Sequence, residues 1–88
     1  MKIVGEPTWN MMREEIRFCL QRDEERFYCA VSQIALNDYY RTEDTQEAAF
    51  MNFRAHTNTV VTLAMEQIDN GQVRNDGVYF VSSTLFGS

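Results

Sequence analysis

The sequence has 88 residues, a formal net charge of −5 and a hydrophobic fraction of 44%. A chain of this length forms one domain, residues 1–88, and its apolar and aromatic content argues against disorder. The acidic balance argues against nucleic acid as a partner, because a protein that binds phosphate backbones needs a basic surface. No apolar run approaches the roughly 18 residues of a membrane span, and the first residues lack the apolar segment of a secretory signal. We therefore expect a cytoplasmic protein without a membrane partner.

The first residues give a weak signal. Ile3 and Val4 form a short apolar run before Gly5 and Pro7, which fits either an edge strand or a tethered arm. The segment that follows contains Trp9, the only tryptophan. We expect this segment to pack across a sheet, and the pattern does not assign its secondary structure.

Residues 15–32 give the clearest strand signal. Apolar and polar side chains alternate on both sides of the polar stretch 22–25, which predicts an antiparallel hairpin. If Leu20 pairs with Phe27, all six apolar side chains lie on one face: Ile16, Phe18, Leu20, Phe27, Cys29 and Val31. A shift by one residue would pair the apolar set with the polar set, so the register is well specified. The turn contains neither Gly nor Asn, which argues against a tight primed turn.

One long amphipathic helix is the central prediction. It covers residues 44–70, with Asp44 as N-cap, Glu47 as its capping-box partner and Gly71 as the stop signal. Apolar positions recur every three or four residues and form one stripe. The stripe consists of Ala49, Phe50, Phe53, Thr57, Val60, Val61, Ala64 and Ile68. The opposite face is small or polar and is expected to meet water: Ala48, Asn52, Ala55, Thr59, Thr62 and Glu66.

Shorter elements complete the chain. Ser32 is a candidate cap for a short helix over residues 33–40, Asp76–Gly77 predicts a turn, and residues 78–82 read as a strand before the tail 83–88. Three side chains of the short helix are expected to turn inward: Ile34, Ala35 and Tyr39. The order strand, strand, helix, helix, strand defines an α+β domain with a small antiparallel or mixed sheet packed on the long helix.

The residues that carry chemistry in other proteins are sparse here. Cys19 and Cys29 fall on opposite faces of the hairpin, so a disulfide between them would break its register. We expect Cys29 to be inert in the core and Cys19, beside Arg17, to be accessible. His56 is the only histidine, which leaves zinc without a ligand set and a Cys–His pair without support from the spacing. We therefore predict no catalytic residue, no metal site and no cofactor.

Four residues are candidate partner contacts: Trp9, Tyr39, Tyr40 and Arg54. Arg, Trp and Tyr are enriched at protein interfaces. Arg54 lies at the border of the helix stripe, one turn after Phe50, where a salt bridge to Glu47 or to an acid on the short helix is the simplest role.

Many of these positions together resemble a known family. The matching motifs are Trp9-Asn10, Arg13, Ile16-x-Phe18, Cys29-x-Val31-Ser32, Ala35-Leu36 and Phe50-x-x-Phe53-Arg54, followed by Ala64, Ile68 and Gly71. Over about residues 4–82 the chain resembles the small bacterial family catalogued as domain of unknown function 1488. It departs from the family pattern at Thr57 and in the hairpin turn, which has no glycine. The resemblance implies a compact bacterial cytoplasmic α+β domain with no established activity.

Three functional hypotheses follow. The first, and our prediction, is a non-enzymatic protein-interaction or regulatory module that binds a protein partner or self-associates as a homodimer through an exposed sheet edge. The second is an acidic inhibitor-like protein that binds a basic site and loses its partner as salt rises. The third is a small thiol-dependent or hydrolytic enzyme, which Cys19→Ser would inactivate.

Overall fold

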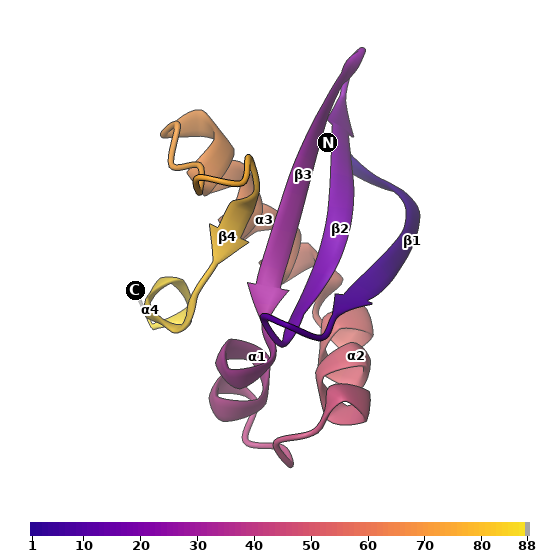
Figure 1. The fold of residues 1–88 in the computed structure, drawn as a ribbon, viewed down its shortest axis with the longest axis vertical. Helices are drawn as coiled ribbons and strands as arrows, with labels where there is room; N and C mark the ends of the chain where they lie inside the picture. The colour runs from indigo at the N-terminus through magenta and orange to yellow at the C-terminus, as the bar shows by residue number, and fades with distance from the viewer. Residues whose placement is uncertain (88) are drawn as a thin grey trace.

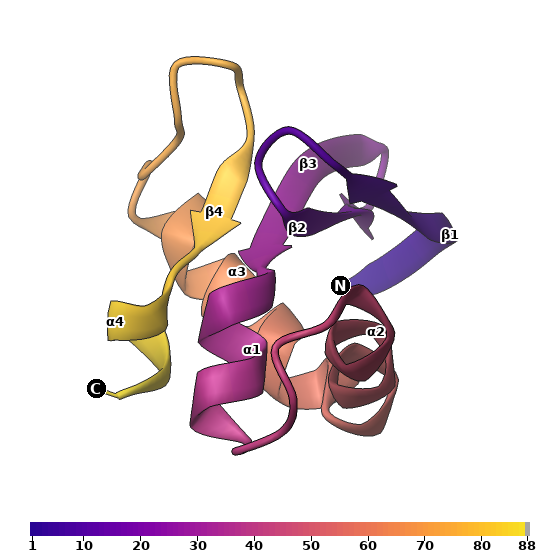
Figure 2. The same cartoon turned by 60° about the horizontal axis from the view of Figure 1, so that its bottom comes forward.

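The computed structural model describes residues 1–87 as a four-stranded mixed sheet with helices packed on one of its faces (Figures 1 and 2). The strands are β1 (Lys2–Asn10), β2 (Glu15–Arg22), β3 (Glu25–Ser32) and β4 (Tyr79–Val81), in that order across the sheet. The first three pair antiparallel, and β4 runs parallel to β3. The helices are α1 (Gln33–Tyr39), α2 (Gln46–Ala55), α3 (Thr57–Asp69) and α4 (Ser83–Phe86). The predicted α+β class is confirmed.

The central hairpin has the predicted register. Leu20 pairs with Phe27, Phe18 with Cys29 and Ile16 with Val31. The expectation of a looser turn is wrong: Arg22 pairs with Glu25, so the turn has two residues. Asp23 takes the left-handed conformation, with φ +56°, and so replaces the glycine that such a turn usually needs.

The weak N-terminal signal belongs to an edge strand, β1, and this strand is bulged. Val4 pairs with Cys19 and Thr8 with Arg17, so the three residues 5–7 of β1 lie opposite Phe18 alone. Gly5 has φ +74°, a conformation open to glycine at little cost. The bulge lifts the middle of β1 and forms one wall of the candidate site described below.

The core lies between the inner face of the sheet and the helices. The rings of Phe18 and Phe53 pack with their centroids 5.3 Å apart, and Leu20 is fully buried. Seven of the eight predicted stripe residues belong to this core or pack against it, and Thr57 is the exception. The expectation for α1 is partly wrong, because Ile34 and Tyr39 are 49% and 52% exposed. Helix α1 begins directly after β3, and its first residue, Gln33, is buried. Leu36 lies three residues further on, on the same side of the helix, and is therefore buried in place of Ile34.

The single long helix predicted over residues 44–70 is wrong. The structure contains two helices, separated at His56 with φ −126° and ψ 34°. The hydroxyl of Thr57 donates to the carbonyl oxygen of Phe53 at 2.7 Å, the acceptor that the backbone N–H of Thr57 would use in a continuous helix. This competition gives a physical reason for the break. The predicted stop is confirmed, since α3 ends at Asp69 and Gly71 has φ +67°.

The start of α2 also differs from the prediction. Thr45, and not Asp44, is the N-cap, and its Oγ1 accepts from the backbone N–H of Ala48 at 3.1 Å. Asp44 instead accepts from the side-chain amide of Gln33 at 2.8 Å. Asn52, predicted to face water, is buried and donates to Asn37 Oδ1 at 3.1 Å. These polar bonds join α2 and the residue pair before it to α1.

The end of the chain is helical where a tail was expected. Helix α4 follows β4, and Phe86 is buried against the rings of Tyr39 and Tyr40, with centroids 5.2 and 6.2 Å away. Ser88 lies outside the described residues. Within residues 1–87, no helix combines the length and the apolar character needed to cross a membrane.

Candidate binding site on the outer face of the sheet

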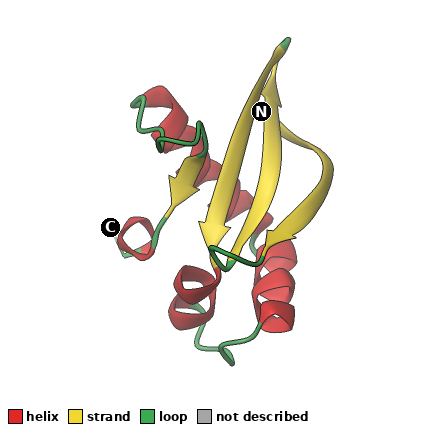
Figure 3. Cartoon of the chain, viewed as in Figure 1, coloured by secondary structure: helices red, strands yellow, loops and turns green. Residues whose placement is uncertain are grey.

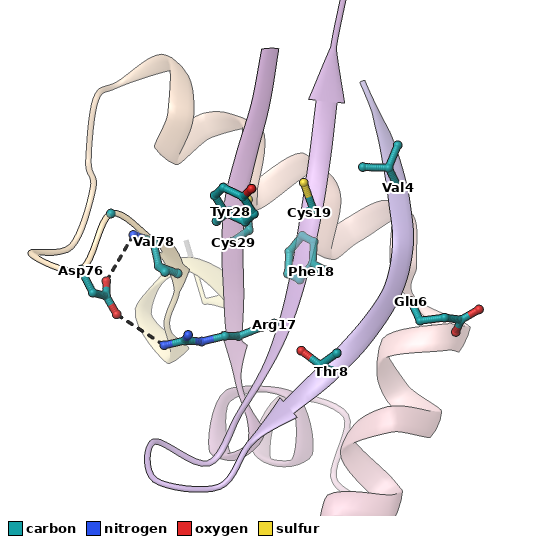
Figure 4. A pocket seen from close by; sticks show the side chains of 11 residues that line it. Val4, Glu6, Thr8, Arg17, Phe18, Cys19, Tyr28, Cys29, Asp76 and Val78 are labelled. Carbon is teal, nitrogen blue, oxygen red and sulfur yellow. Dashed lines mark hydrogen bonds and ion pairs between the residues drawn. The ribbon is translucent and has the colours of Figure 1, made fainter. Parts of the chain in front are cut away.

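Among residues 1–87, no helix covers the outer face of the sheet, which lies opposite the core (Figure 2). Its side chains come from neighbouring strands, because Val4 pairs with Cys19, Cys19 with Tyr28, and Thr8 with Arg17. These five side chains lie side by side on one surface. They line a pocket of about 400 Å³, shown in Figure 4 and called here the outer-face pocket.

Two walls border the outer-face pocket. The bulge of β1 forms one wall and contributes Glu6. The loop from α3 to β4, drawn in green in Figure 3, forms the other and contributes Asp76, Gly77 and Val78. Gly77 has φ +81°, as the predicted Asp76–Gly77 turn requires. The pocket therefore depends on where this loop is held.

A buried ion pair fixes the loop on the sheet. Glu15 on β2 is only 1% exposed. Arg74 donates two hydrogen bonds to its carboxylate, from Nη1 to Oε1 at 2.7 Å and from Nη2 to Oε2 at 2.9 Å. Arg17 Nε adds a third, to Oε2 at 3.1 Å. The guanidinium of Arg74 also lies 4.9 Å from the ring centre of Phe80 on β4. Such bidentate, charge-assisted bonds combine strength with fixed geometry.

Hydrogen bonds among Glu15, Arg74 and Asp76 shift the pKa values of all three groups. Burial raises the pKa of Glu15, but hydrogen bonds from Arg74 and Arg17 outweigh burial, so its pKa lies below the usual value. The hydrogen bond to Glu15 raises the pKa of Arg74. A hydrogen bond from Arg74 lowers the pKa of Asp76, which also accepts from the backbone N–H of Val78 at 3.2 Å. At neutral pH, both carboxylates are therefore ionised.

The floor of the pocket presents donors that the chain itself does not use. Tyr28 is 61% exposed, and among residues 1–87 neither its hydroxyl nor that of Thr8 has a hydrogen-bond partner. The thiol of Cys19 makes one long contact, 3.8 Å to the carbonyl oxygen of Leu20. In Figure 4, Arg17 reaches from β2 towards Asp76, with 3.5 Å between Nη2 and Oδ2. An incoming ligand can compete for this long contact.

The two thiols differ as the hairpin pattern predicts. Both cysteines are free, Cys29 is buried and Cys19 is partly exposed. Burial raises the pKa of Cys29 to about 12, which makes that thiol unreactive at neutral pH. His56 stacks on Tyr40, with ring centroids 3.7 Å apart. Within the described part of the chain, no three His, Cys, Asp or Glu side chains are grouped to hold a metal ion.

The four predicted contact residues lie elsewhere. The rings of Tyr39 and Tyr40 meet edge to face at 4.9 Å. Trp9 and Arg54 both reach Phe50, whose ring centre is 6.2 Å from that of Trp9 and 5.8 Å from the guanidinium carbon of Arg54. No ion pair joins Arg54 to an acid among residues 1–87. None of the four lines the outer-face pocket.

The predicted contacts omitted Thr8, Arg17, Tyr28 and Asp76. The hairpin register already placed Arg17 and Tyr28 on the outward side of two paired strands, so the pattern contained a signal for the floor. The loop wall gave no such signal, because Arg74 and Glu15 are 59 residues apart in the chain.

Fold and site together define a small two-layer α+β protein with a pocket on its open sheet face. The family model described as "Protein of unknown function (DUF1488)" matches residues 4–81, so the chain belongs to this family, as the sequence motifs indicated. It is also similar to a crystal structure of a DUF1488-family protein of unknown function from Shewanella loihica PV-4. The TM-score is 0.78 at 19% identity, covering 90% of this chain and 88% of the other. This similarity establishes the fold alone. Among curated proteins, none matches the chain.

Proposed function

We propose that this protein is a non-enzymatic binding module that receives a segment of a partner protein in the outer-face pocket. The observation that carries the proposal is the floor of the pocket, where Thr8, Arg17 and Tyr28 present donors from three paired strands. Side chains on the strands of a folded sheet are already ordered, so they lose little conformational entropy when a ligand binds.

The position of the thiol supports binding over catalysis. A thiol-dependent enzyme needs a base within hydrogen-bond reach of its nucleophile. Cys19 lies on the outer face of the sheet, whereas His56 stacks on Tyr40 between α2 and α3. The described residues therefore supply a thiol and a histidine in separate places.

The edges of the sheet favour a pocket ligand over strand-to-strand dimerisation. The bulge at residues 5–7 interrupts the free edge of β1, and Pro7 within it has no backbone donor. The opposite edge strand, β4, has three residues. Both features shorten the backbone ladder that a second strand would need.

Selective alkylation of Cys19 tests this proposal. N-ethylmaleimide should react with Cys19 and so occupy the pocket, and it should leave Cys29 unmodified because that thiol is buried. Immobilised wild-type protein should retain a specific partner from a lysate of the native host. Alkylated protein and Tyr28→Ala should lose that partner, while Met51→Ala, an exposed change on α2, should keep it. Cys19→Ser should also keep it, because the smaller side chain leaves the pocket open.

Two results would refute the proposal. One is a partner retained equally by blocked and unblocked protein, which would place the contact outside the pocket. The other is the absence of any partner that depends on the pocket.

A further inference from the structure

The geometry points to a carboxylate as the group that the outer-face pocket recognises, held by the guanidinium of Arg17. This inference rests on the proposed function and specifies its ligand. The carboxylate is the C-terminus of a peptide, because the proposed ligand is a segment of a partner protein.

Arg17 has donors to spare. A guanidinium has five N–H groups, arranged in a fork that matches a carboxylate. Arg17 uses Nε for Glu15 at 3.1 Å and one Nη2 donor for the long contact to Asp76 at 3.5 Å. Its Nη1 has no partner among residues 1–87, and its side chain is 39% exposed. Nη1 and the second Nη2 donor are therefore available to a ligand in the pocket that Arg17 lines.

The charge around the pocket is balanced although the whole chain is acidic. Three arginines, Arg13, Arg17 and Arg74, lie near three carboxylates, Glu6, Glu15 and Asp76. Recognition of a carboxylate therefore depends on the directional donors of Arg17 and not on an excess of positive charge, in a chain with a net charge of −5. Arg13 is exposed and makes no ion pair in the described part of the chain.

The surrounding acids select a single negative charge. Asp76 lies beside Arg17, and Glu6 belongs to the opposite wall. A phosphate dianion would meet about twice the repulsion of a carboxylate from these two groups, by simple proportion to charge. A carboxylate can take the place of the long Asp76 contact, because Asp76 keeps its shorter bond to Arg74 at 2.9 Å.

The rest of the pocket suits the chain that carries the carboxylate. The hydroxyls of Thr8 and Tyr28 are available to hydrogen-bond a neighbouring amide or the second oxygen. Val4 on the sheet surface and Val78 on the loop wall supply apolar surface. An acid with an adjoining apolar side chain, such as a C-terminal valine, uses all of these groups.

A titration followed by ¹H–¹⁵N NMR tests the inference on the whole protein. The probes are N-acetylvalylvaline, its C-terminal methylamide, benzoate and inorganic phosphate. The acid peptide should shift the amide signals of Arg17, Cys19 and Gly77 and bind at least about tenfold tighter than its methylamide, since charge-assisted hydrogen bonds exceed neutral ones in strength. Phosphate should bind more weakly than either acid.

Variants assign the effect to Arg17. Arg17→Gln should remove the preference for acid over methylamide, while Arg22→Gln, an exposed arginine paired with Asp69, should leave it intact. If Arg17→Gln does not fold, Arg17→Lys serves instead, because it keeps the charge beside Glu15 and loses the fork. We expect the lysine variant to bind the acid peptide several-fold more weakly.

The outcomes separate the inference from the proposed function. Tighter binding of the acid peptide than of benzoate supports a peptide C-terminus, and the reverse would overturn that assignment. Equal binding of acid and methylamide, a preference that survives Arg17→Gln, tighter binding of phosphate, or no shift up to about 50 mM acid would each overturn the carboxylate assignment. If the carboxylate assignment fails but the alkylation experiment captures a partner that depends on the pocket, the proposed function as a binding module is retained. Only the inferred chemistry of its ligand is then wrong.

Discussion

The two faces of the sheet are organised by different kinds of interaction. The inner face is apolar and covered by helices, and its central contact is Phe18 against Phe53. The outer face is polar, and it is partly covered by a loop that the Glu15–Arg74 pair holds in place. The hydrophobic effect acts on the first face and grows with buried area, whereas the second depends on a few directional bonds. Stability should therefore be concentrated on the inner face and binding on the outer face.

The largest expected effect comes from opening the inner face. Phe53→Ala removes a buried ring that packs on Phe18 and should lower the free energy of unfolding by about 3–5 kcal/mol. Urea denaturation followed by circular dichroism measures this change. Met51→Ala on the same helix, where the side chain is 62% exposed, should change stability by less than about 0.5 kcal/mol. A Phe53→Ala protein as stable as Met51→Ala would contradict the position of the core.

The next largest effect tests the outer face. Arg74→Ala removes two of the three arginine hydrogen bonds to Glu15, whose carboxylate is buried, and should cost about 2–4 kcal/mol, since a buried charge loses its partner. The matched control is Arg22→Ala. Its pair with Asp69 is exposed on both sides and should contribute less than about 1 kcal/mol. Equal effects of the two substitutions would show that the Glu15–Arg74 pair does not hold the loop.

The sequence predicts the inner face far better than the outer one. Alternation between residues 15 and 32 placed Phe18 and Cys29 correctly, because a strand repeats every two residues and one face must be buried. Helix periodicity found Phe53 by the same kind of argument. Helix periodicity did not predict the break at His56, because the apolar stripe continues across it. The cause is local: the hydroxyl of Thr57 donates to the backbone carbonyl oxygen of Phe53.

The pocket could be predicted only in part. The register placed Cys19 beside Tyr28, with Arg17 two residues from Cys19 on the same face, which gives the floor. The walls come from a bulge in β1 and from a loop fixed by Arg74, and neither follows from local periodicity. The predicted contacts Trp9 and Arg54 were chosen for residue type, which says nothing about where an arginine lies relative to a pocket.

A pH series sharpens the comparison by acting on one face. The folded pKa of Glu15 lies below its ordinary value near 4.5, so its ionised form stabilises the fold above that pH. This contribution is lost as the pH falls through the folded pKa. Wild-type protein should therefore lose stability on acidification from pH 5 towards pH 3, and Glu15→Gln should show a shallower dependence, with both measured by urea denaturation at each pH. Parallel curves for the two proteins would contradict the role of Glu15.

The smallest effect compares two cysteines on adjacent strands. Cys29→Ser places a hydroxyl in the apolar core and should cost about 1–3 kcal/mol, whereas Cys19→Ser on the outer face should cost less than about 0.5 kcal/mol. Brief treatment of the folded protein with N-ethylmaleimide, followed by mass spectrometry, should add one label, at Cys19. Cys29 is protected both by burial and by its pKa of about 12. If Cys29 reacts as fast as Cys19, the inner face opens far more often than its packing implies, and the contrast between the two faces fails.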